Sequence, residues 1–381
     1  MAPKWIAVAF TALLLSALGQ TQTFTTVFDF TTGGYPFAAL IQDGADNLYS
    51  TGATLDDSND GGVFKIDTAG AMTVLHIFTG SPDGFSPMTP LVQDTLGNFY
   101  GTTMSGGVDN QGAVFEIDTA GNETILYSFA GGTTDGCNPY QGLVMDASGN
   151  LYGTMVNCGT AGYGTVFKLS SAGTETVLHN FTGGASDGAY PHYGHLLLDE
   201  SSNLFGLTME GGISESGVLY EVTAAGAFEV LHRFAGGTKD GCYPIGTLAT
   251  DKLGSFYGTT TSCGRYGWGT VWKVSKKGMK TILHNFAGAP ADGAIPYAGV
   301  VLDSKGYMYG TTSGGGKHDD GTLYRLSNNG TLTLLHSFHG SDGWNPIGEV
   351  LRNKNQDLYG TTVQGGSHDD GTVWQYVPRN R

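Results

Sequence analysis

Two short segments near the C-terminus combine histidine with aspartate, and a third near the N-terminus combines aspartate with serine. The first two, His318-Asp319-Asp320 and His368-Asp369-Asp370, repeat one pattern at a distance of 50 residues. The third, Asp56-x-Ser58-x-Asp60-Gly61, resembles a shortened form of an oxygen-rich calcium loop but lacks the glutamate expected at its end. Carboxylates suit hard cations, and histidine beside aspartate also suits zinc or manganese. The pattern predicts a metal site with calcium as the favoured ion, and the alternative is a solvated acidic face. The predicted ligands are Asp56, Ser58, Asp60, His318, Asp320, His368 and Asp370.

Aromatic and basic side chains form a second candidate site. Tyr163 and Trp268 each precede the glycine of a recurring segment, where other copies carry Asp, Gln or Ser. Arg265 and Tyr266 lie just before Trp268. Because most copies lack these rings, the fold does not require them, and exposed Tyr and Trp beside Arg could stack on sugars or anchor a protein partner. The alternative is that the rings pack against neighbouring cysteine-containing loops.

An enzyme would need an acid–base or nucleophilic centre, and the sequence shows none. Seven short segments follow an X-Pro step, and small residues dominate the third position after the proline, which holds Ala39, Pro90, Gly142, Gly194, Thr247, Gly299 and Glu349. His192, His195 and Glu349 depart from this pattern and are ligand-binding candidates. No nucleophile elbow, phosphate-binding glycine loop or zinc-protease helix occurs, so no catalytic residue is assigned.

These candidates are positioned by a unit of about 52 residues that occurs seven times. Its marker is a Leu-Tyr-Gly-Thr-like segment, and the steps between successive markers are 51, 52, 53, 52, 52 and 50 residues. The aromatic residues of the markers are Tyr49, Tyr100, Tyr152, Phe205, Tyr257, Tyr309 and Tyr359. Each unit contains four runs of β-branched and aromatic residues bounded by Gly, Asn and Asp, which is typical of strands and hairpins. The last unit lacks its closing segment, and a matching one, Thr25–Phe30, lies at the other end of the chain.

A four-stranded unit of this length cannot bury both of its faces alone, so the units must stack, and around an axis they form a propeller. We predict an all-β, seven-bladed β-propeller with four antiparallel strands per blade, closed by the N-terminal segment as the outer strand of the last blade. An open solenoid is the alternative, but it does not explain the split unit. The loops that enter the first strand and those that join the second to the third share one rim, the long-loop face. A ligand site is expected on that face, because its loops are longer and more varied.

Two series of polar residues recur with the unit and are expected to be structural, since a site requires asymmetry. The aspartates precede a glycine and can accept hydrogen bonds from the backbone of a tight turn. The histidines belong to the outermost strands, where they should lie far from one another. The series are His76, His179, His232, His284 and His336, and Asp83, Asp135, Asp187, Asp240, Asp292 and Asp342.

The four cysteines occupy equivalent positions in two units, with Cys137 and Cys158, and likewise Cys242 and Cys263, 21 residues apart. Their paired occurrence predicts two local disulfides in an oxidising compartment. A zinc site is the alternative, but it would need four ligands to converge from distant units.

Residues 1–19 combine Lys4 with an apolar run and small residues at its end, which predicts a signal peptide and a secreted or periplasmic protein. Residues 20–381 should form one propeller domain, and no further apolar run predicts a membrane span in the mature chain. The net charge of −16 argues against nucleic acid and anionic lipid as partners. A monomer is expected.

The sequence motifs of the units resemble those of the GloVer tandem repeat family of exported bacterial proteins. The matching stretches are 292–297 (Asp-Gly-Ala-Ile-Pro-Tyr), 151–154 (Leu-Tyr-Gly-Thr), 164–169 (Gly-Thr-Val-Phe-Lys-Leu) and 177–181 (Val-Leu-His-Asn-Phe). The resemblance covers residues 24–377 and implies a propeller, often joined to a surface anchor, with no catalytic residue set. We expect no added anchor domain in this chain, so surface attachment is not predicted.

Together these features predict an exported binding or interaction module for extracellular glycan or protein, with Ca²⁺ as the one candidate cofactor. The enzyme alternative is a metal-assisted hydrolase or lyase with its site on the varied loops of the long-loop face. A purely structural surface protein is the third.

Overall fold

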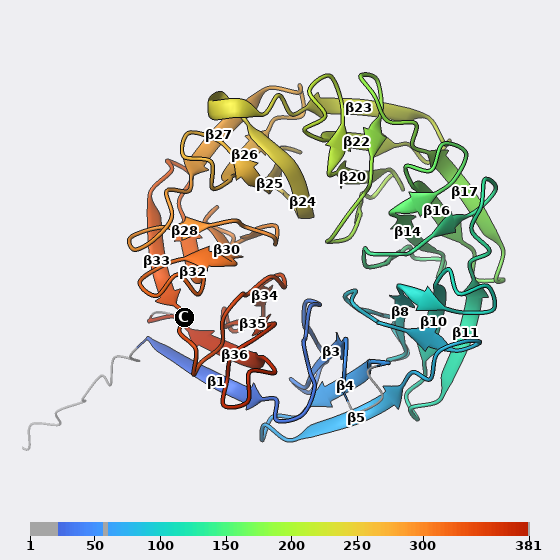
Figure 1. Ribbon diagram of the computed structural model, residues 1–381, viewed down its shortest axis with the longest axis horizontal. Coiled ribbons are helices and arrows are strands. Elements are labelled where there is room, and N and C mark those ends of the chain that lie inside the picture. Colours follow the sequence, from blue (N-terminus) through green and yellow to red (C-terminus); the bar gives the residue numbers. More distant parts are fainter. Residues whose placement is uncertain (1–21, 56–59, 380–381) are drawn as a thin grey trace, which may run out of the picture.

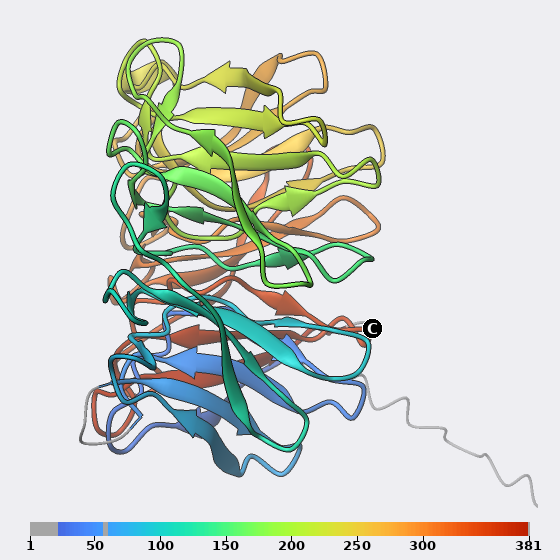
Figure 2. The same ribbon diagram turned by 90° about the vertical axis from the view of Figure 1, so that its right-hand side faces the viewer.

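The computed structural model describes residues 22–55 and 60–379. Seven four-stranded antiparallel sheets surround a central axis, and the chain passes once around the ring (Figure 1). In profile the sheets form a thick disk with loops at both rims (Figure 2). The predicted seven-bladed β-propeller is confirmed.

Each blade runs from an inner strand at the axis to an outer strand at the circumference. The strands, from inner to outer, are: in blade one, β2 (Ile41–Gln42), β3 (Leu48–Gly52), β4 (Gly62–Ile66) and β5 (Met72–Ile77); in blade two, β7 (Val92–Gln93), β8 (Phe99–Thr103), β10 (Ala113–Ile117) and β11 (Glu123–Ser128); in blade three, β13 (Val144–Met145), β14 (Leu151–Met155), β16 (Thr165–Leu169) and β17 (Glu175–Asn180); in blade four, β19 (Leu197–Leu198), β20 (Leu204–Thr208), β22 (Val218–Val222) and β23 (Phe228–Arg233); in blade five, β24 (Gly241–Thr250), β25 (Phe256–Cys263), β26 (Thr270–Val274) and β27 (Lys280–Asn285); in blade six, β29 (Val301–Leu302), β30 (Met308–Thr312), β32 (Thr322–Leu326) and β33 (Leu332–Ser337); and in blade seven, β34 (Leu351–Arg352), β35 (Leu358–Thr362), β36 (Thr372–Val377) and β1 (Thr23–Asp29).

Short two-stranded ladders brace the long-loop face. They pair β6 (Gly84–Phe85) with β9 (Ser105–Gly106), β12 (Gly136–Cys137) with β15 (Asn157–Cys158), β18 (Gly188–Ala189) with β21 (Glu210–Gly211), and β28 (Gly293–Ala294) with β31 (Gly314–Gly315). One 3₁₀ turn, η1 (Gly237–Lys239), enters blade five. No helix in the described ranges is long and apolar enough to span a membrane.

The N-terminal strand closes the ring, as predicted. β1 lies beside β36 and completes blade seven in the order β1-β36-β35-β34. Its register pairs Thr23 with Val377 and Asp29 with Thr372. Phe24 stacks on His336 of blade six, with ring centroids 3.5 Å apart, so the strand also contacts the preceding blade.

Apolar side chains fill the spaces between neighbouring blades, so that the core is a series of layers. One layer joins Tyr152 and Phe181 of blade three to Leu204 and Tyr220 of blade four. The marker glycine makes room for the largest ring of each blade, because a Cβ at Gly258 would lie 2.6 Å from the Trp272 ring that faces it across the ladder. Blade one has Ser50 at this position, opposite the smaller ring of Phe64. The recurrence of Tyr-Gly-Thr therefore reflects packing.

Candidate functional site

Seven residues of the inner strands meet at the axis. In each blade an inner-strand residue pairs with the marker aromatic, for example Val144 with Tyr152 and Leu197 with Phe205. Two positions earlier lies the residue that faces its counterparts across the axis. We call these residues the axial ring: Ala39, Pro90, Gly142, His195, Thr247, Gly299 and Glu349.

This register corrects the alignment expected from the prolines. Counting from Pro191 assigned Gly194 to the axis, but a parallel bridge joins Gly142 to His195 and the Gly142 amide donates to the Gly194 carbonyl at 2.7 Å. Blade four thus contains one extra residue between its proline and its inner strand, which accounts for the 53-residue step. His195, and not Gly194, is the axial residue of blade four.

The three polar members of the axial ring form one hydrogen-bonded group from blades four, five and seven. Glu349 Oε1 accepts the Thr247 amide at 2.7 Å, and the His195 amide donates to Thr247 Oγ1 at 3.1 Å. His195 Nε2 lies 3.7 Å from Glu349 Oε2, while its Nδ1 is 3.0 Å from the Leu196 carbonyl. Gly299 belongs to the blade between those of Thr247 and Glu349, and an added Cβ there would collide with the Thr247 backbone. Two predicted candidates, His195 and Glu349, therefore do converge.

The extra residue of blade four builds an aromatic cluster above this group, at the long-loop end of the axis. His192 stacks on Tyr140 of blade three, with ring centroids 4.4 Å apart. Tyr193 packs edge-on against Tyr140 at 5.4 Å and against Tyr297 of blade six at 5.8 Å. Gly194 permits the turn that follows, because its φ is 83° and a Cβ there would lie 2.4 Å from the Gly246 carbonyl carbon.

Burial controls the charge of this cluster, which we call the axial mouth (Tyr140, His192, Tyr193 and Tyr297). It lowers the pKa of His192 to about 4, so the imidazole is neutral at neutral pH. It raises the pKa of Tyr193 to about 12, with smaller contributions from Tyr140 and Tyr297. The Nδ1 atom of His192 is shielded from solvent and has no hydrogen-bond partner in the part of the chain that the structure describes. The mouth thus combines uncharged rings with an unused polar atom.

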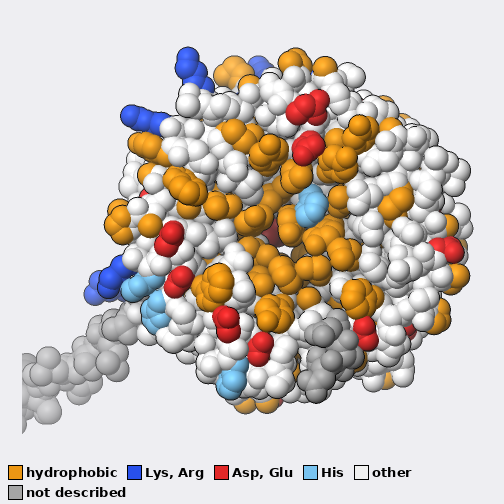
Figure 3. Space-filling model, in the orientation of Figure 1, with side chains coloured by type: hydrophobic (Ala, Val, Ile, Leu, Met, Phe, Trp, Pro, Cys, Tyr) orange, Lys and Arg blue, Asp and Glu red, His pale blue; other side chains and the backbone are white. Residues whose placement is uncertain are grey.

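Seen down the axis, hydrophobic side chains gather around the centre of the long-loop face, with one histidine among them (Figure 3). The hollow at the mouth has a cavity volume of only about 30 Å³, and Glu349 lies at its floor. A wider hollow of about 630 Å³ opens at the opposite end of the axis, lined by His195, Glu349 and apolar inner-strand residues. The mouth can therefore take a group laid across its rings or a narrow group inserted between them.

The predicted aromatic residues of the outer loops lie apart from the axis and from one another. Tyr163 and Trp268 are 36% and 45% exposed, and blade four separates their blades. Each ring covers a glycine of the next loop, Gly183 beneath Tyr163 and Gly288 beneath Trp268. Gln111 and Ser216 lie against the equivalent glycines Gly131 and Gly236, so covering this glycine is a shared scaffold role.

Arg265 and Tyr266 extend the exposed surface beside Trp268. The guanidinium lies 5.3 Å from the Tyr266 ring centroid, and this ring is half exposed. These two residues remain available for a partner, and their role as ligand-binding residues stays a prediction.

The predicted cation ligands do not assemble within the described ranges. His318 packs edge-on against His339 at 5.6 Å, and His368 Nδ1 bonds Ser367 Oγ at 2.7 Å. Asp320, Asp370 and Asp60 join no described group of three ligand atoms within 4.8 Å of one another. Asp56 and Ser58 lie outside the described residues, so a calcium site at this edge of the ring stays a prediction.

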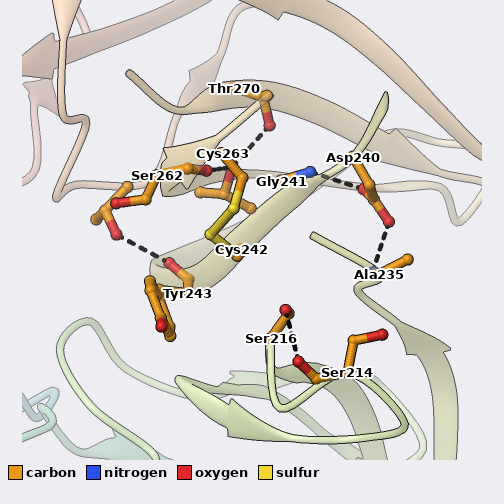
Figure 4. Close-up of a disulfide and its surroundings, with 12 residues drawn as sticks. Ser214, Ser216, Ala235, Asp240, Gly241, Cys242, Tyr243, Ser262, Cys263 and Thr270 are labelled. Atoms are coloured by element: carbon orange, nitrogen blue, oxygen red, sulfur yellow. Dashed lines mark hydrogen bonds between the residues drawn. A yellow bond between two sulfur atoms is a disulfide. The ribbon is translucent and has the colours of Figure 1, made fainter. Parts of the chain in front are cut away.

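Both predicted disulfides are confirmed. Cys137 bonds Cys158 and Cys242 bonds Cys263, each with Cα atoms 5.4 Å apart. The second member of each pair has a φ of 64°, at a position where blades two, four and six carry glycine. Each bond fastens the hairpin at a blade's entry, next to the aspartate turn in which Asp240 accepts the amides of Gly241 and Ala235 (Figure 4).

Sequence analysis missed Tyr140, Tyr193 and Tyr297 as site residues. Tyr140 and Tyr297 directly follow the proline of their units, and Tyr193 lies two residues after Pro191, so that they look like part of the recurring pattern. The 53-residue step could have indicated them, because a residue inserted into blade four must change the path of the chain where it enters the inner strand at the axis.

Solved structures with the same architecture include proteins of several kinds. Virginiamycin B lyase from Staphylococcus aureus matches with a TM-score of 0.60 and 11% identity, over 94% of this chain and 99% of that one. The extracellular domain of a one-component system from B. thetaiotaomicron matches with a TM-score of 0.59 and 11% identity, over 92% of this chain and 39% of that one. Puromycin hydrolase matches with a TM-score of 0.57 and 13% identity, over 88% of this chain and 50% of that one. At these identities the similarity concerns the fold alone.

No curated protein has a sequence that matches this chain significantly. The family model of the Gloeobacter/Verrucomicrobia repeat, in contrast, matches three overlapping ranges, 13–198, 86–252 and 243–381. These ranges span the propeller from end to end and agree with the resemblance of the units to GloVer repeats. The chain therefore belongs to the Gloeobacter/Verrucomicrobia repeat family.

Proposed function

We propose that this protein is an exported binding module that holds a neutral glycan against the axial mouth. The observation that carries the proposal is the extra residue of blade four, which brings His192 and Tyr193 against Tyr140 and Tyr297 at the centre of the long-loop face. Sugar rings present apolar faces that stack on aromatic side chains, and the rings of Tyr140, Tyr193 and Tyr297 line the hollow at the mouth.

The charge of the mouth favours a neutral ligand. His192 is uncharged at neutral pH because burial lowers its pKa to about 4. Glu349 places a carboxylate at the floor, and the chain as a whole carries a net charge of −16. The Glu349 carboxylate and the net negative charge of the chain would both repel an anionic glycan.

Binding fits the mouth better than catalysis does. The cavity of about 30 Å³ at the mouth leaves no room for a substrate to approach Glu349 from that end, and the hollow of about 630 Å³ that reaches both His195 and Glu349 opens at the opposite end of the axis. Their polar atoms also hold the ring together, through the Thr247 amide and the Leu196 carbonyl. The enzyme alternative would require turnover that is lost in His195→Ala, and an absence of turnover on glycans and lactones would exclude it.

Export is supported by two features of the chain. Residues 1–19 have the composition of a signal peptide, and both disulfides need an oxidising compartment to persist. A glycan of the cell surface or surroundings would then be within reach.

The test compares two double variants on an array of immobilised neutral oligosaccharides. Tyr140→Ala with Tyr193→Ala should weaken retention about 5- to 100-fold, since each stacked ring contributes about 0.5–1.5 kcal/mol. Tyr266→Ala with Trp268→Ala is the matched control, because it removes two exposed rings outside the axis and should leave retention unchanged.

Melting curves establish that both variants stay folded. If the axial variant binds as the wild type does, or if only the control loses binding, the axial site is wrong. If the wild type binds no oligosaccharide on the array but captures a protein partner, the glycan proposal is replaced by a protein-binding one.

A further inference from the structure

Around the circumference each outer strand ends near the beginning of the outer strand of the next blade (Figure 1). A histidine–aspartate pair recurs at these boundaries. In three blades the histidine ring nitrogen Nε2 is hydrogen-bonded to the aspartate. The distances are 3.2 Å for His179 and Asp187, 2.9 Å for His284 and Asp292, and 2.9 Å for His336 and Asp342. These pairs confirm the structural role expected for the two series.

The third member of each group comes from the beginning of the next outer strand, as the first residue of β11, β23 and β27 and the second residue of β1, and its type differs from boundary to boundary. Phe228 stacks on His179 at 3.8 Å, and Phe24 stacks on His336 at 3.5 Å. Aromatic third members therefore cover the pair with an uncharged ring. Glu123, between blades one and two, and Lys280, between blades four and five, hold the same register opposite the last residue of the third strand.

At the first boundary the usual hydrogen bond is absent. His76 Nε2 lies 3.4 Å from Asp83 Oδ2, and neither His76 Nε2 nor Glu123 Oε1 has a hydrogen-bond partner among the described residues, although both atoms are shielded from solvent. Within residues 22–55 and 60–379, these three side chains are the one group whose ligand atoms all lie within 4.8 Å of one another. Unpaired buried polar atoms are costly, so two of them aimed at one point call for a bound group.

The boundary between blades four and five has Lys280 in the position of Glu123 and shows which other side chain this position accommodates. There the Lys280 ammonium contacts Asp240 and lies 4.4 Å above the Phe234 ring, while His232 Nε2 has no hydrogen-bond partner. A cation therefore replaces the histidine as the partner of the aspartate. At the first boundary His76 Nε2 stays within 3.4 Å of Asp83 Oδ2 without a hydrogen bond, the third member is a carboxylate, and no lysine or arginine of the described residues forms an ion pair with either carboxylate.

We propose that His76, Asp83 and Glu123 form a binding site for a divalent transition-metal ion such as Zn²⁺. One imidazole nitrogen and two carboxylate oxygens are a ligand set that zinc accepts, with water completing four-coordination. Asp83 is already oriented, since its Oδ2 accepts the Thr79 amide at 3.0 Å and its Oδ1 accepts the Gly84 amide at 2.7 Å. Such outer contacts fix the direction of a metal-binding carboxylate.

The next boundary contains a natural control. Glu175 and Asp135 repeat the two carboxylates, but Tyr127 replaces the histidine and donates its hydroxyl to Asp135 Oδ2 at 3.3 Å. This boundary lacks the nitrogen ligand and should bind Zn²⁺ poorly. Tyr127→His should therefore create a second site of the same kind.

The experiment titrates Zn²⁺ into the metal-free, disulfide-intact full chain in competition with a chromophoric chelator. Co²⁺ in place of Zn²⁺ reports four-coordination by its visible absorption. Glu123→Phe copies the boundaries of Phe228 and Phe24, and should stay folded while binding Zn²⁺ at least about 100-fold more weakly. Glu123→Lys copies the boundary of Lys280 and should have the same effect, whereas Glu175→Gln should change nothing.

Two results would overturn the site. One is unchanged Zn²⁺ affinity in Glu123→Phe or His76→Ala, which would place the metal elsewhere. The other is a Tyr127→His variant that gains no additional ion, because this substitution completes the same ligand set in the same register. Loss of the Co²⁺ spectrum in Glu123→Phe, with a gain in Tyr127→His, establishes the assignment.

Discussion

A chain that lacks residues 22–29 is expected to lose its cooperative unfolding transition. Deleting β1 removes the half-buried side chains of Phe24, Val27 and Phe28, each contributing about 1–2 kcal/mol, and leaves the edge of β36 unpaired. A domain has only about 5–15 kcal/mol of stability to lose. Thermal unfolding followed by circular dichroism measures the effect, and aggregation through the open edge should accompany it.

A circular permutant is the matched control. Thr23 pairs with Val377, so residues 22–29 can follow residue 379 through a short turn such as Asn-Gly and occupy the same place in blade seven. The permutant should regain the cooperative transition. A deletion variant that melts like the wild type would show that β1 does not close the ring.

Replacing Trp272 by alanine is expected to lower the free energy of unfolding by about 3–5 kcal/mol. The indole is fully buried, faces Gly258 across the ladder, and packs edge-on against Phe234 at 5.2 Å. Trp272→Phe should cost much less, because other blades place Phe there and the indole N–H has no partner to lose. Equilibrium denaturation in urea gives all three values.

Gly258→Ala tests the same contact from the other side and should cost about 1–3 kcal/mol, since the added methyl group would lie 2.6 Å from the indole. Combining it with Trp272→Phe should recover part of this loss, as blade one combines Ser50 with Phe64. Costs below 0.5 kcal/mol, as for ordinary surface substitutions, would contradict the packing account.

The sequence was sufficient for the fold because each unit repeats the same strand and turn signals, and because the split unit requires its two parts to meet. The pairing of the cysteines followed from the same equivalence. Repetition also explained the aspartate turns, whose carboxylates do accept the backbone amides that follow and precede them, as Asp240 does.

The sites were harder to predict than the fold. They depend on contacts between residues of different units that do not occupy equivalent positions in the repeat. Counting from Pro191 misplaced the axis by one residue and hid the meeting of His195 with Glu349. The zinc-site proposal depends on Glu123, which looks like an ordinary strand residue until the next blade brings it against His76. Conversely, the position of Tyr163 and Trp268 holds different residue types in different units, yet both rings cover a glycine of the scaffold.

The central claim is that recurring residues serve the scaffold and that sites arise where one unit departs from the others. Deleting Tyr193 tests it most directly, because His192-Gly194-His195 then matches Ile347-Gly348-Glu349 of blade seven in length. We predict that oligosaccharide retention by this regularised chain falls at least about 10-fold while its melting transition is preserved. Retention equal to that of the wild type would contradict the claim.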